Sequence, residues 1–256
     1  MRLYSVLLPL LCTLSFAVQA QTAEQVAIRA DENLRGYGDV QMRLEMVLVS
    51  PDGETASRRL RVRSREAGET RDQTLMTFDT PRDLAGSGLL SHNQATGDDE
   101  QWLYLPAVKR IKQIGARNKS GPFMGSEFAF EDIVTPFWQK FRYQSLAEDK
   151  LDGLPCFTLE RIPNDRYSGY ARQRVWVDKA QYLIRRIEYY DRKNALLKTY
   201  EASEFQQYAG QYWRPGRMLM VNHQTGKQTR LLWSDYSFHT GLTAQDFSQN
   251  ALLRVR

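Results

Sequence analysis

Short segments in which every second residue is apolar fill most of this chain, and they constrain its fold more than any other feature. From Val40 to Leu48, apolar side chains alternate with Gln41, Arg43 and Glu45. A period of two is the pattern of a β-strand with one buried face. On this basis the residues expected to form strands are 40–48, 59–65, 73–79, 88–92, 101–105, 109–114, 141–146, 156–162, 172–178, 183–191, 196–205, 212–223 and 229–238.

The connections between these segments are short and have the composition of turns. Examples are Pro51-Asp52-Gly53, Asp152-Gly153 and the polar stretches 191–194 and 224–227. Consecutive strands joined in this way form an antiparallel meander, because parallel strands need long crossovers. The chain contains no tandem repeat and no long linker, so residues 21–256 are expected to form one mainly β domain.

Two helical pieces flank the predicted strands. Thr22 is a candidate N-cap, and Gln25 completes the pattern of a capping box. An apolar stripe at helical spacing follows, and Gly36 is placed to end the helix. The members of the stripe are Ala23, Val26, Ala27, Ala30 and Leu34. Near the other end, residues 243–246 predict one capped helical turn.

The first twenty residues predict export. Arg2 is their sole charge, an apolar core follows, and residues 18–20 form a small-x-small cleavage site. This is the pattern of a secretory signal peptide cleaved after Ala20, and it predicts an exported protein. Cys12 is preceded by Leu11 rather than by a small residue, so no lipid anchor is expected. Cys156 is then the one cysteine of the mature chain and is expected to be a small core residue.

Charge and motif content narrow the function. Lys and Arg number 35 against 30 Asp and Glu, and loss of Arg2 leaves 34 − 30 = +4. This modest excess suits an anionic lipid head group or membrane surface, whereas the export signal disfavours nucleic acid. The three histidines are widely spaced and no catalytic or phosphate-binding motif is present, so no enzyme activity, cofactor or metal site is predicted. The pairs Asp98-Asp99 and Glu131-Asp132 are expected to be solvated turns or charges at helix starts.

The most unusual stretch runs from Trp102 to Asp132. It begins as an aromatic and aliphatic strand that Pro106 ends, and it continues as a basic run interleaved with aliphatic residues. A glycine-bracketed apolar tip comes next, and the stretch ends in the aromatic and acidic residues 127–132. Together these segments predict a surface for a partner that is both apolar and anionic.

With these residues in place, the sequence resembles the LolA-like family of periplasmic outer-membrane lipoprotein-sorting proteins. The resemblance rests on Trp102-Leu103-Tyr104-Leu105-Pro106, on Lys109-Arg110-Ile111, on Gly125-Ser126-Glu127-Phe128 with Glu131-Asp132, and on Arg174-Val175-Trp176-Val177-Asp178. The match is to the branch that accompanies RND-type exporters more than to the dedicated lipoprotein chaperone. Its layout covers essentially the whole mature chain, but no cargo-contact residue of the dedicated chaperone can be carried over one by one.

The resemblance implies a strongly curved antiparallel sheet that forms an incomplete barrel, with helices as a lid over its concave apolar face. It also implies a carrier that shields an acyl chain of a lipid or lipoprotein between membranes, working with an RND-type inner-membrane transporter and touching membrane surfaces transiently. The alternative is an accessory subunit that docks to an exporter and regulates it without carrying cargo. A secreted hydrolase is a third hypothesis, which would need carboxylates or histidines clustered in one cleft.

Two sets of side chains are candidates for these roles. The apolar set could contact cargo and comprises Met42, Met46, Trp102, Tyr104, Phe123, Met124, Phe128, Phe130, Met218 and Met220. The basic set could bind a head group or dock a partner and comprises Lys109, Arg110, Lys112, Arg117 and Lys119. Ordinary core packing is the competing interpretation for each methionine. The tip at Phe123-Met124 is either an exposed prong or lid, or a loop that folds back, and the basic run is either a clamp or a solvated strand face.

Overall fold

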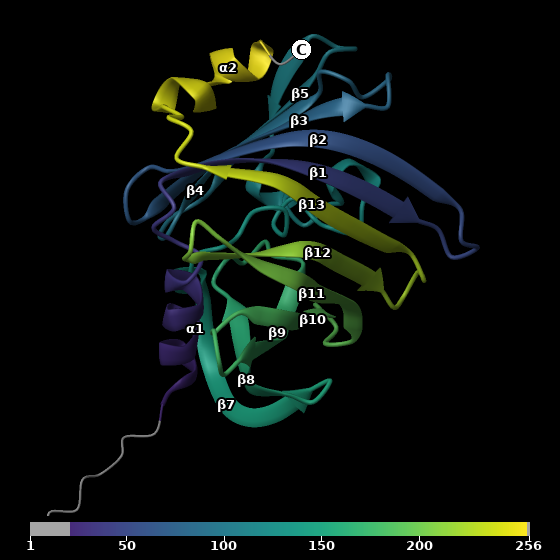
Figure 1. The fold of residues 1–256 in the computed structure, drawn as a ribbon. Helices are drawn as coiled ribbons and strands as arrows, with labels where there is room; N and C mark the ends of the chain where they lie inside the picture. Colours follow the sequence, from purple (N-terminus) through teal and green to yellow (C-terminus); the bar gives the residue numbers. More distant parts are fainter. Residues whose placement is uncertain (1–20, 255–256) are drawn as a thin grey trace, which may run out of the picture.

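One antiparallel sheet of thirteen strands forms the body of the protein in the computed structural model, which describes residues 21–254 (Figure 1). The predicted signal peptide, residues 1–20, lies outside the described residues. Every predicted strand is confirmed, with small shifts at the ends. The strands are β1 Asp39–Val49, β2 Thr55–Glu66, β3 Arg71–Thr80, β4 Gly88–Gln94, β5 Glu100–Leu105, β6 Arg110–Gln113, β7 Phe141–Leu151, β8 Leu154–Pro163, β9 Tyr170–Asp178, β10 Ile184–Asp191, β11 Leu196–Tyr208, β12 Tyr212–Asn222 and β13 Gln228–Phe238.

The order of the strands shows how the barrel stays incomplete. The sheet runs β6-β5-β4-β3-β2-β1-β13-β12-β11-β10-β9-β8-β7, so that β6 and β7 are its two edges and do not pair with each other. Two meanders, β1–β6 and β7–β13, meet where β1 pairs with β13. The chain therefore begins and ends its sheet in the middle, and the curved sheet of the incomplete barrel is confirmed (Figure 1).

Residues 114–140 connect the two edges of the sheet and are called here the crossing segment. They contain three single 3-10 turns, η1 Ala116–Asn118, η2 Phe123–Gly125 and η3 Trp138–Lys140. Phe123 is completely buried and its ring lies 5.9 Å from that of Phe78 on β3. Phe128 joins the same core, in which side chains from both meanders pack. The crossing segment therefore lies inside the curved sheet, and its apolar side chains are buried in the main core.

Helix α1, Ala23–Glu32, begins as the sequence predicts. Thr22 caps it, and the side chain of Gln25 accepts a hydrogen bond from the backbone N–H of Thr22, which completes the capping box. The buried face carries Val26 and Ala30, which pack into the main core on the concave side. In Figure 1 the helix stands beside β7 and β8. It covers only part of the concave face.

Helix α2, Gln249–Leu253, is not part of the lid that was expected over the concave face. With the 3-10 turn η4, Ala244–Phe247, it packs Leu252 and Phe247 against Leu75 and Leu90. Leu75 lies between Thr74 and Met76, which face the concave side, and alternation places it on the convex face. This helix therefore covers apolar side chains on the outside of the sheet. The concave face is covered by α1 and the irregular crossing segment, rather than by helices alone.

Cys156 is completely buried in β8, as expected for a core residue. No helix within residues 21–254 is both long enough and apolar enough to cross a membrane.

Candidate functional site

A cavity of about 670 Å³ lies between the concave face of the sheet, α1 and the crossing segment. Much of its wall is aliphatic or aromatic, with Ala27 and Ala30 from α1, Val175 and Ile187 from the sheet, and Val134 from the crossing segment. Ligand pockets in proteins usually enclose about 300–1,000 Å³. The interior of the curved sheet is therefore not filled by its own side chains, and the space left is of a size that holds a small amphiphile.

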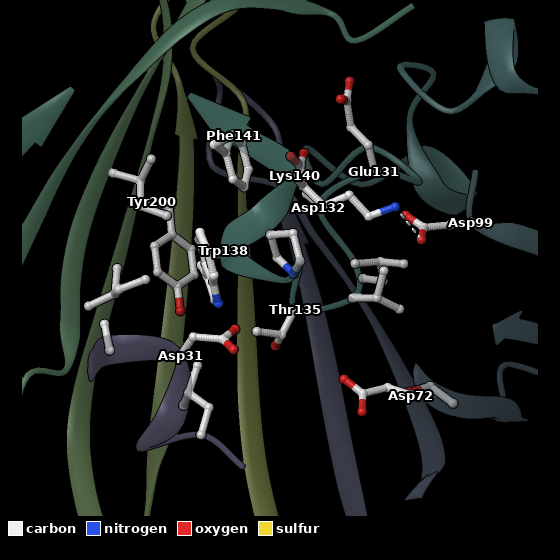
Figure 2. A pocket seen from close by; sticks show the side chains of 18 of the residues that line it. Asp31, Asp72, Asp99, Glu131, Asp132, Thr135, Trp138, Lys140, Phe141 and Tyr200 are labelled. Carbon is white, nitrogen blue, oxygen red and sulfur yellow. Dashed lines mark hydrogen bonds and ion pairs between the residues drawn. The ribbon is translucent and has the colours of Figure 1, made fainter. Parts of the chain in front are cut away.

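Charged side chains form a second part of the cavity wall. Asp31 on α1 and Asp72 on β3 extend into the cavity (Figure 2), and Arg35 bridges them with N–O distances of 2.6 and 2.8 Å. Burial raises the pKa of Asp72, with Arg35 opposing the shift. Nearby, the ammonium of Lys140 lies 2.9 Å from the carboxylate of Asp99, the pair joined by a dashed line in Figure 2. One guanidinium therefore serves two carboxylates in this part of the cavity wall.

A buried ion pair fastens the crossing segment to the sheet. The ammonium of Lys198 on β11 lies 2.7 Å from the carboxylate of Asp132, and the two side chains are only 6% and 4% exposed. Asp132 also accepts hydrogen bonds from the hydroxyl of Tyr170 and the backbone N–H of Ala129. The expectation that Glu131-Asp132 is a solvated turn was therefore wrong. The sequence pattern could not show that the loop lies inside the sheet, opposite a lysine 66 residues away.

Glu131 makes a second fastening on the other side of the same loop. Its carboxylate accepts hydrogen bonds from the hydroxyl of Ser168 (2.7 Å) and the backbone N–H of Gly169 (2.8 Å). Burial, and then the neighbouring charge of Asp132, raise the pKa of Glu131 to about 7. This carboxyl therefore changes its protonation near neutral pH.

Further polar contacts hold the tip of the loop. The side chain of Arg58 donates to the carbonyl of Met124, and the carboxylate of Glu127 accepts from Asn222 on β12 at 2.7 Å. Of the two alternatives for the tip, the structure shows the loop folded back, with Phe123 buried and Met124 half-buried. The glycines that bracket the tip allow this return rather than an exposed prong.

The predicted apolar set divides into three groups. Four of its members line the cavity, namely Met42, Phe128, Phe130 and Met218. Met46, Phe123 and Met220 are completely buried in the core and do not line the cavity, and Met124 packs at the edge of that core.

Trp102 and Tyr104 form the third group, on the other face of the sheet. Both pack with the cluster that α2 covers, and the rings of Trp102 and His92 lie 5.1 Å apart. Alternation correctly predicts that they share a face of β5, but it does not say which face is concave. The β5 side chains on the concave side are Gln101, which lines the cavity, and Leu103, which packs against the main core.

The predicted basic set is also divided. Lys109, Arg110, Lys112 and Arg117 are exposed, and the first three lie with Val108 at and beside the turn between β5 and β6. The side chain of Val108 is 59% exposed. Lys119 instead is buried, lines the cavity, and donates from its ammonium to the carbonyl of Asp99 at 2.6 Å.

Known structures identify the family. The crystal structure of a domain from Vibrio parahaemolyticus, described as an outer membrane lipoprotein-sorting protein domain, is 46% identical to this chain. The match covers 90% of this chain and 98% of that domain, with a TM-score of 0.87. The chain belongs to the outer membrane lipoprotein-sorting family. The resemblance to this family, found in the sequence, is thereby confirmed at the level of the family.

Other comparisons find further proteins with a similar fold. A DUF1329 family protein from Desulfovibrio piger is 28% identical over 90% of this chain and 97% of its own, with a TM-score of 0.84. A LolA superfamily protein from Nitrosomonas europaea is 21% identical over 91% and 100%, with a TM-score of 0.73, and shows the shared fold. A family model described as an uncharacterized protein matches residues 70–254. No curated protein matches the chain.

Several cavity residues were missed by reading the sequence of this family member. Asp72, Gln101 and Arg161 all line the cavity although each is a polar residue within a strand. One signal could have found Arg161. It is a polar residue two positions after the apolar Leu159, so both side chains lie on the same face of β8. Within residues 21–254, no three His, Cys, Asp or Glu side chains form a group that could hold a metal ion.

Proposed function

We propose that this protein is a periplasmic carrier whose cavity shields the acyl chain of a lipid or lipoprotein during transfer between membranes. The observation that carries the proposal is the apolar cavity of about 670 Å³ inside the curved sheet. Membership of the outer membrane lipoprotein-sorting family supports it. Such a role needs a dry space and a means of opening, and it needs no catalytic step.

The energetics suit a carrier. Burying one methylene is worth about 0.8 kcal/mol, so an acyl chain of roughly a dozen methylenes gains on the order of 10 kcal/mol. In our proposal Met42, Phe128, Phe130 and Met218 contact the chain, since all four line the cavity. Methionine side chains adapt to irregular apolar guests. Release then requires a membrane or partner that offers comparable burial.

The partner in this proposal is an RND-type inner-membrane transporter, with transient contact to a membrane surface. The exposed Val108 beside Lys109, Arg110 and Lys112 supports docking through the turn between β5 and β6. An exposed aliphatic side chain next to several cations can bind an anionic surface that also has an apolar part. The same turn would serve an accessory subunit that carries nothing, so the decisive test is cargo binding.

The test uses delipidated protein and a fluorescent acyl chain. Met218→Trp fills the cavity and is expected to weaken binding by about tenfold or more, because the chain loses burial of roughly two methylenes. Leu219→Trp is the matched control, since Leu219 is the next residue on β12 and does not line the cavity. It should leave binding unchanged. Failure of the unaltered protein to bind any amphiphile would reject the carrier and favour the accessory subunit.

A further inference from the structure

A row of polar side chains crosses the concave face from β7 to β12. Strand register places Tyr143 opposite Arg161, Arg161 opposite Gln173, and Gln173 opposite Tyr189. Tyr189 is in turn opposite Lys198, and Lys198 is opposite Asn222. Residues directly opposite in neighbouring strands present their side chains to the same face. A polar belt therefore runs through the otherwise apolar wall of this half of the sheet.

The buried positive charges at the two ends of the belt have different partners. At the β11–β12 end, Lys198 is paired with Asp132, and Asn222 donates to the carboxylate of Glu127. Both carboxylates come from the crossing segment. At the β7–β8 end, Arg161 is only 7% exposed, yet no carboxylate among the described residues forms an ion pair with it. The crossing segment thus supplies counter-charges to one end of the belt and leaves the other end open to the cavity.

The other two arginines of the cavity wall are Arg35 and Arg214, and of these only Arg35 pairs with carboxylates among the described residues. Arg35 is shared by two carboxylates, and Arg214 donates to the carbonyls of Trp213 and Leu34. The guanidinium of Arg161 donates from Nε to the amide oxygen of Gln173 at 2.8 Å and packs 4.0 Å from the centre of the Phe141 ring. The hydroxyl of Tyr143 also hydrogen-bonds the guanidinium, and Asp132 acts on it at longer range. The oxygens of the Asp132 carboxylate already accept from Lys198, Tyr170 and Ala129.

A buried cation without a counter-ion is costly, and arginine stays charged at any physiological pH. Burial lowers the pKa of Arg161, which is the physical sign of this cost. The planar guanidinium presents a fork of donors that matches a carboxylate or phosphate better than any neutral group. An anion is therefore favoured beside Arg161, which has no ion-paired carboxylate among the described residues, and disfavoured beside Asp72 on β3.

We propose that Arg161 binds the anionic head of the cargo, a carboxylate or phosphate, while the alkyl chain lies along the apolar wall. This inference rests on the proposed carrier function and adds to it the chemical class of the guest. It also gives the guest an orientation, with its charge at the β7–β8 end of the polar belt.

The experiment compares amphiphiles that share one alkyl chain and differ in the head group. Displacement of an uncharged fluorescent probe from the delipidated full chain gives the affinities of the alkyl carboxylate, phosphate, alcohol and ammonium. The carboxylate or the phosphate is expected to bind about tenfold more tightly than the alcohol, which corresponds to about 1.4 kcal/mol, and the ammonium should bind least. Acetate and inorganic phosphate alone should not displace the probe, because the alkyl chain supplies most of the affinity.

Two variants separate recognition from folding. Arg161→Met should lower the affinity for the anionic amphiphile about tenfold, to that of the alcohol, without lowering the thermal stability, because a buried uncompensated charge is removed. Arg161→Lys keeps the charge but not the fork, and should retain part of the preference; it serves if the methionine variant does not fold. Arg142→Met is the control, since Arg142 is an exposed neighbour on β7 that does not line the cavity.

The outcomes distinguish the inference from the function on which it depends. Equal affinity for carboxylate, phosphate and alcohol would overturn the role of Arg161 and leave the carrier intact. A preference that survives in Arg161→Met would do the same. Binding of acetate or phosphate as tight as that of the amphiphiles would overturn the assignment to a lipid head. If none of the amphiphiles binds, the carrier and the inference both fall.

Discussion

The crossing segment is held in place by a few buried charges, each with a named partner. Asp132 meets Lys198 and Tyr170, while Glu131 meets Ser168 and the backbone of Gly169. Each group is removed from water, so the loss of one partner leaves the other uncompensated. These residues decide whether the loop stays inside the sheet.

Replacing Lys198 by methionine tests the ion pair. The change leaves the Asp132 carboxylate buried without a counter-charge, and it should lower the free energy of unfolding by about 3–5 kcal/mol. Urea unfolding measures the effect. Lys150→Met, at the exposed end of β7, should change the free energy of unfolding by less than about 0.5 kcal/mol. Equal effects of the two substitutions would show that the pair does not hold the loop.

Glu131 gives the loop a dependence on pH. Its pKa is about 7 in the folded protein against an ordinary value of 4.5, so between these values the folded state keeps a proton that the unfolded state releases. The contribution of Glu131 to stability is therefore greatest below pH 4.5 and is lost as pH rises through about 7. Glu131→Gln cannot ionise, and its stability relative to the unaltered protein should rise between about pH 5 and pH 8. Thermal unfolding at several pH values measures this. The exposed Glu54→Gln should show no such trend, and a parallel pair of curves for Glu131→Gln would contradict the prediction.

At the scale of elements, helix α1 and the crossing segment together cover the cavity. Both lie on the concave side, but their origins differ. The helix is fixed by local chemistry, namely a capping box and an apolar stripe. The crossing segment has little regular structure and depends on contacts with distant strands.

Removing the N-cap of α1 tests how firmly this helix is held. Thr22→Ala removes the side-chain oxygen that accepts from the backbone N–H of Gln25, and it should cost about 1 kcal/mol of stability. Hydrogen exchange should speed up in the first turns of α1, whereas Thr22→Ser keeps the acceptor and should exchange like the unaltered protein. Unchanged exchange in the alanine variant would show that packing alone holds the start of the helix.

The same distinction explains what could be predicted from the sequence. Strands, turns and the N-cap of α1 are local patterns and were confirmed, although α1 ends at Glu32, with Asn33 as its C-cap, and not at Gly36. The candidate site was predicted less well, because face and burial depend on distant residues. Trp102 and Tyr104 lie on the convex face because residues of η4 and α2 near the other end of the chain cover them. Arg161 lies in the cavity because the sheet curves, and a single strand pattern does not contain that curvature.

At the scale of the whole molecule, the pairing of β1 with β13, called here the seam, joins the two meanders into one sheet. Each of these strands also pairs with a neighbour in its own meander, β1 with β2 and β13 with β12. The main core takes Leu44 and Met46 from β1 and Leu231 from β13. The cavity wall is continuous only because this seam is made.

Two shortened chains test the seam. A chain that ends at Lys227 lacks β13, and we expect it to show no cooperative unfolding transition, because both meanders lose their common border. A chain that ends at Thr240 keeps β13 but lacks η4 and α2. It should unfold cooperatively at lower urea, since Leu75 and Leu90 become exposed. A cooperative transition in the shorter chain would mean that the meanders fold independently.

The seam also sets an order of events during biosynthesis. In the sheet, β1 lies between β2 and β13. Because β13 is the last strand to be synthesised, β1 can pair with it only after the other twelve strands have been made. Contacts between such distant parts of a chain form slowly and leave sheet edges exposed in the meantime. In the proposed carrier, an acyl chain would therefore be accepted only after β13 has paired with β1 and closed the border between the two meanders.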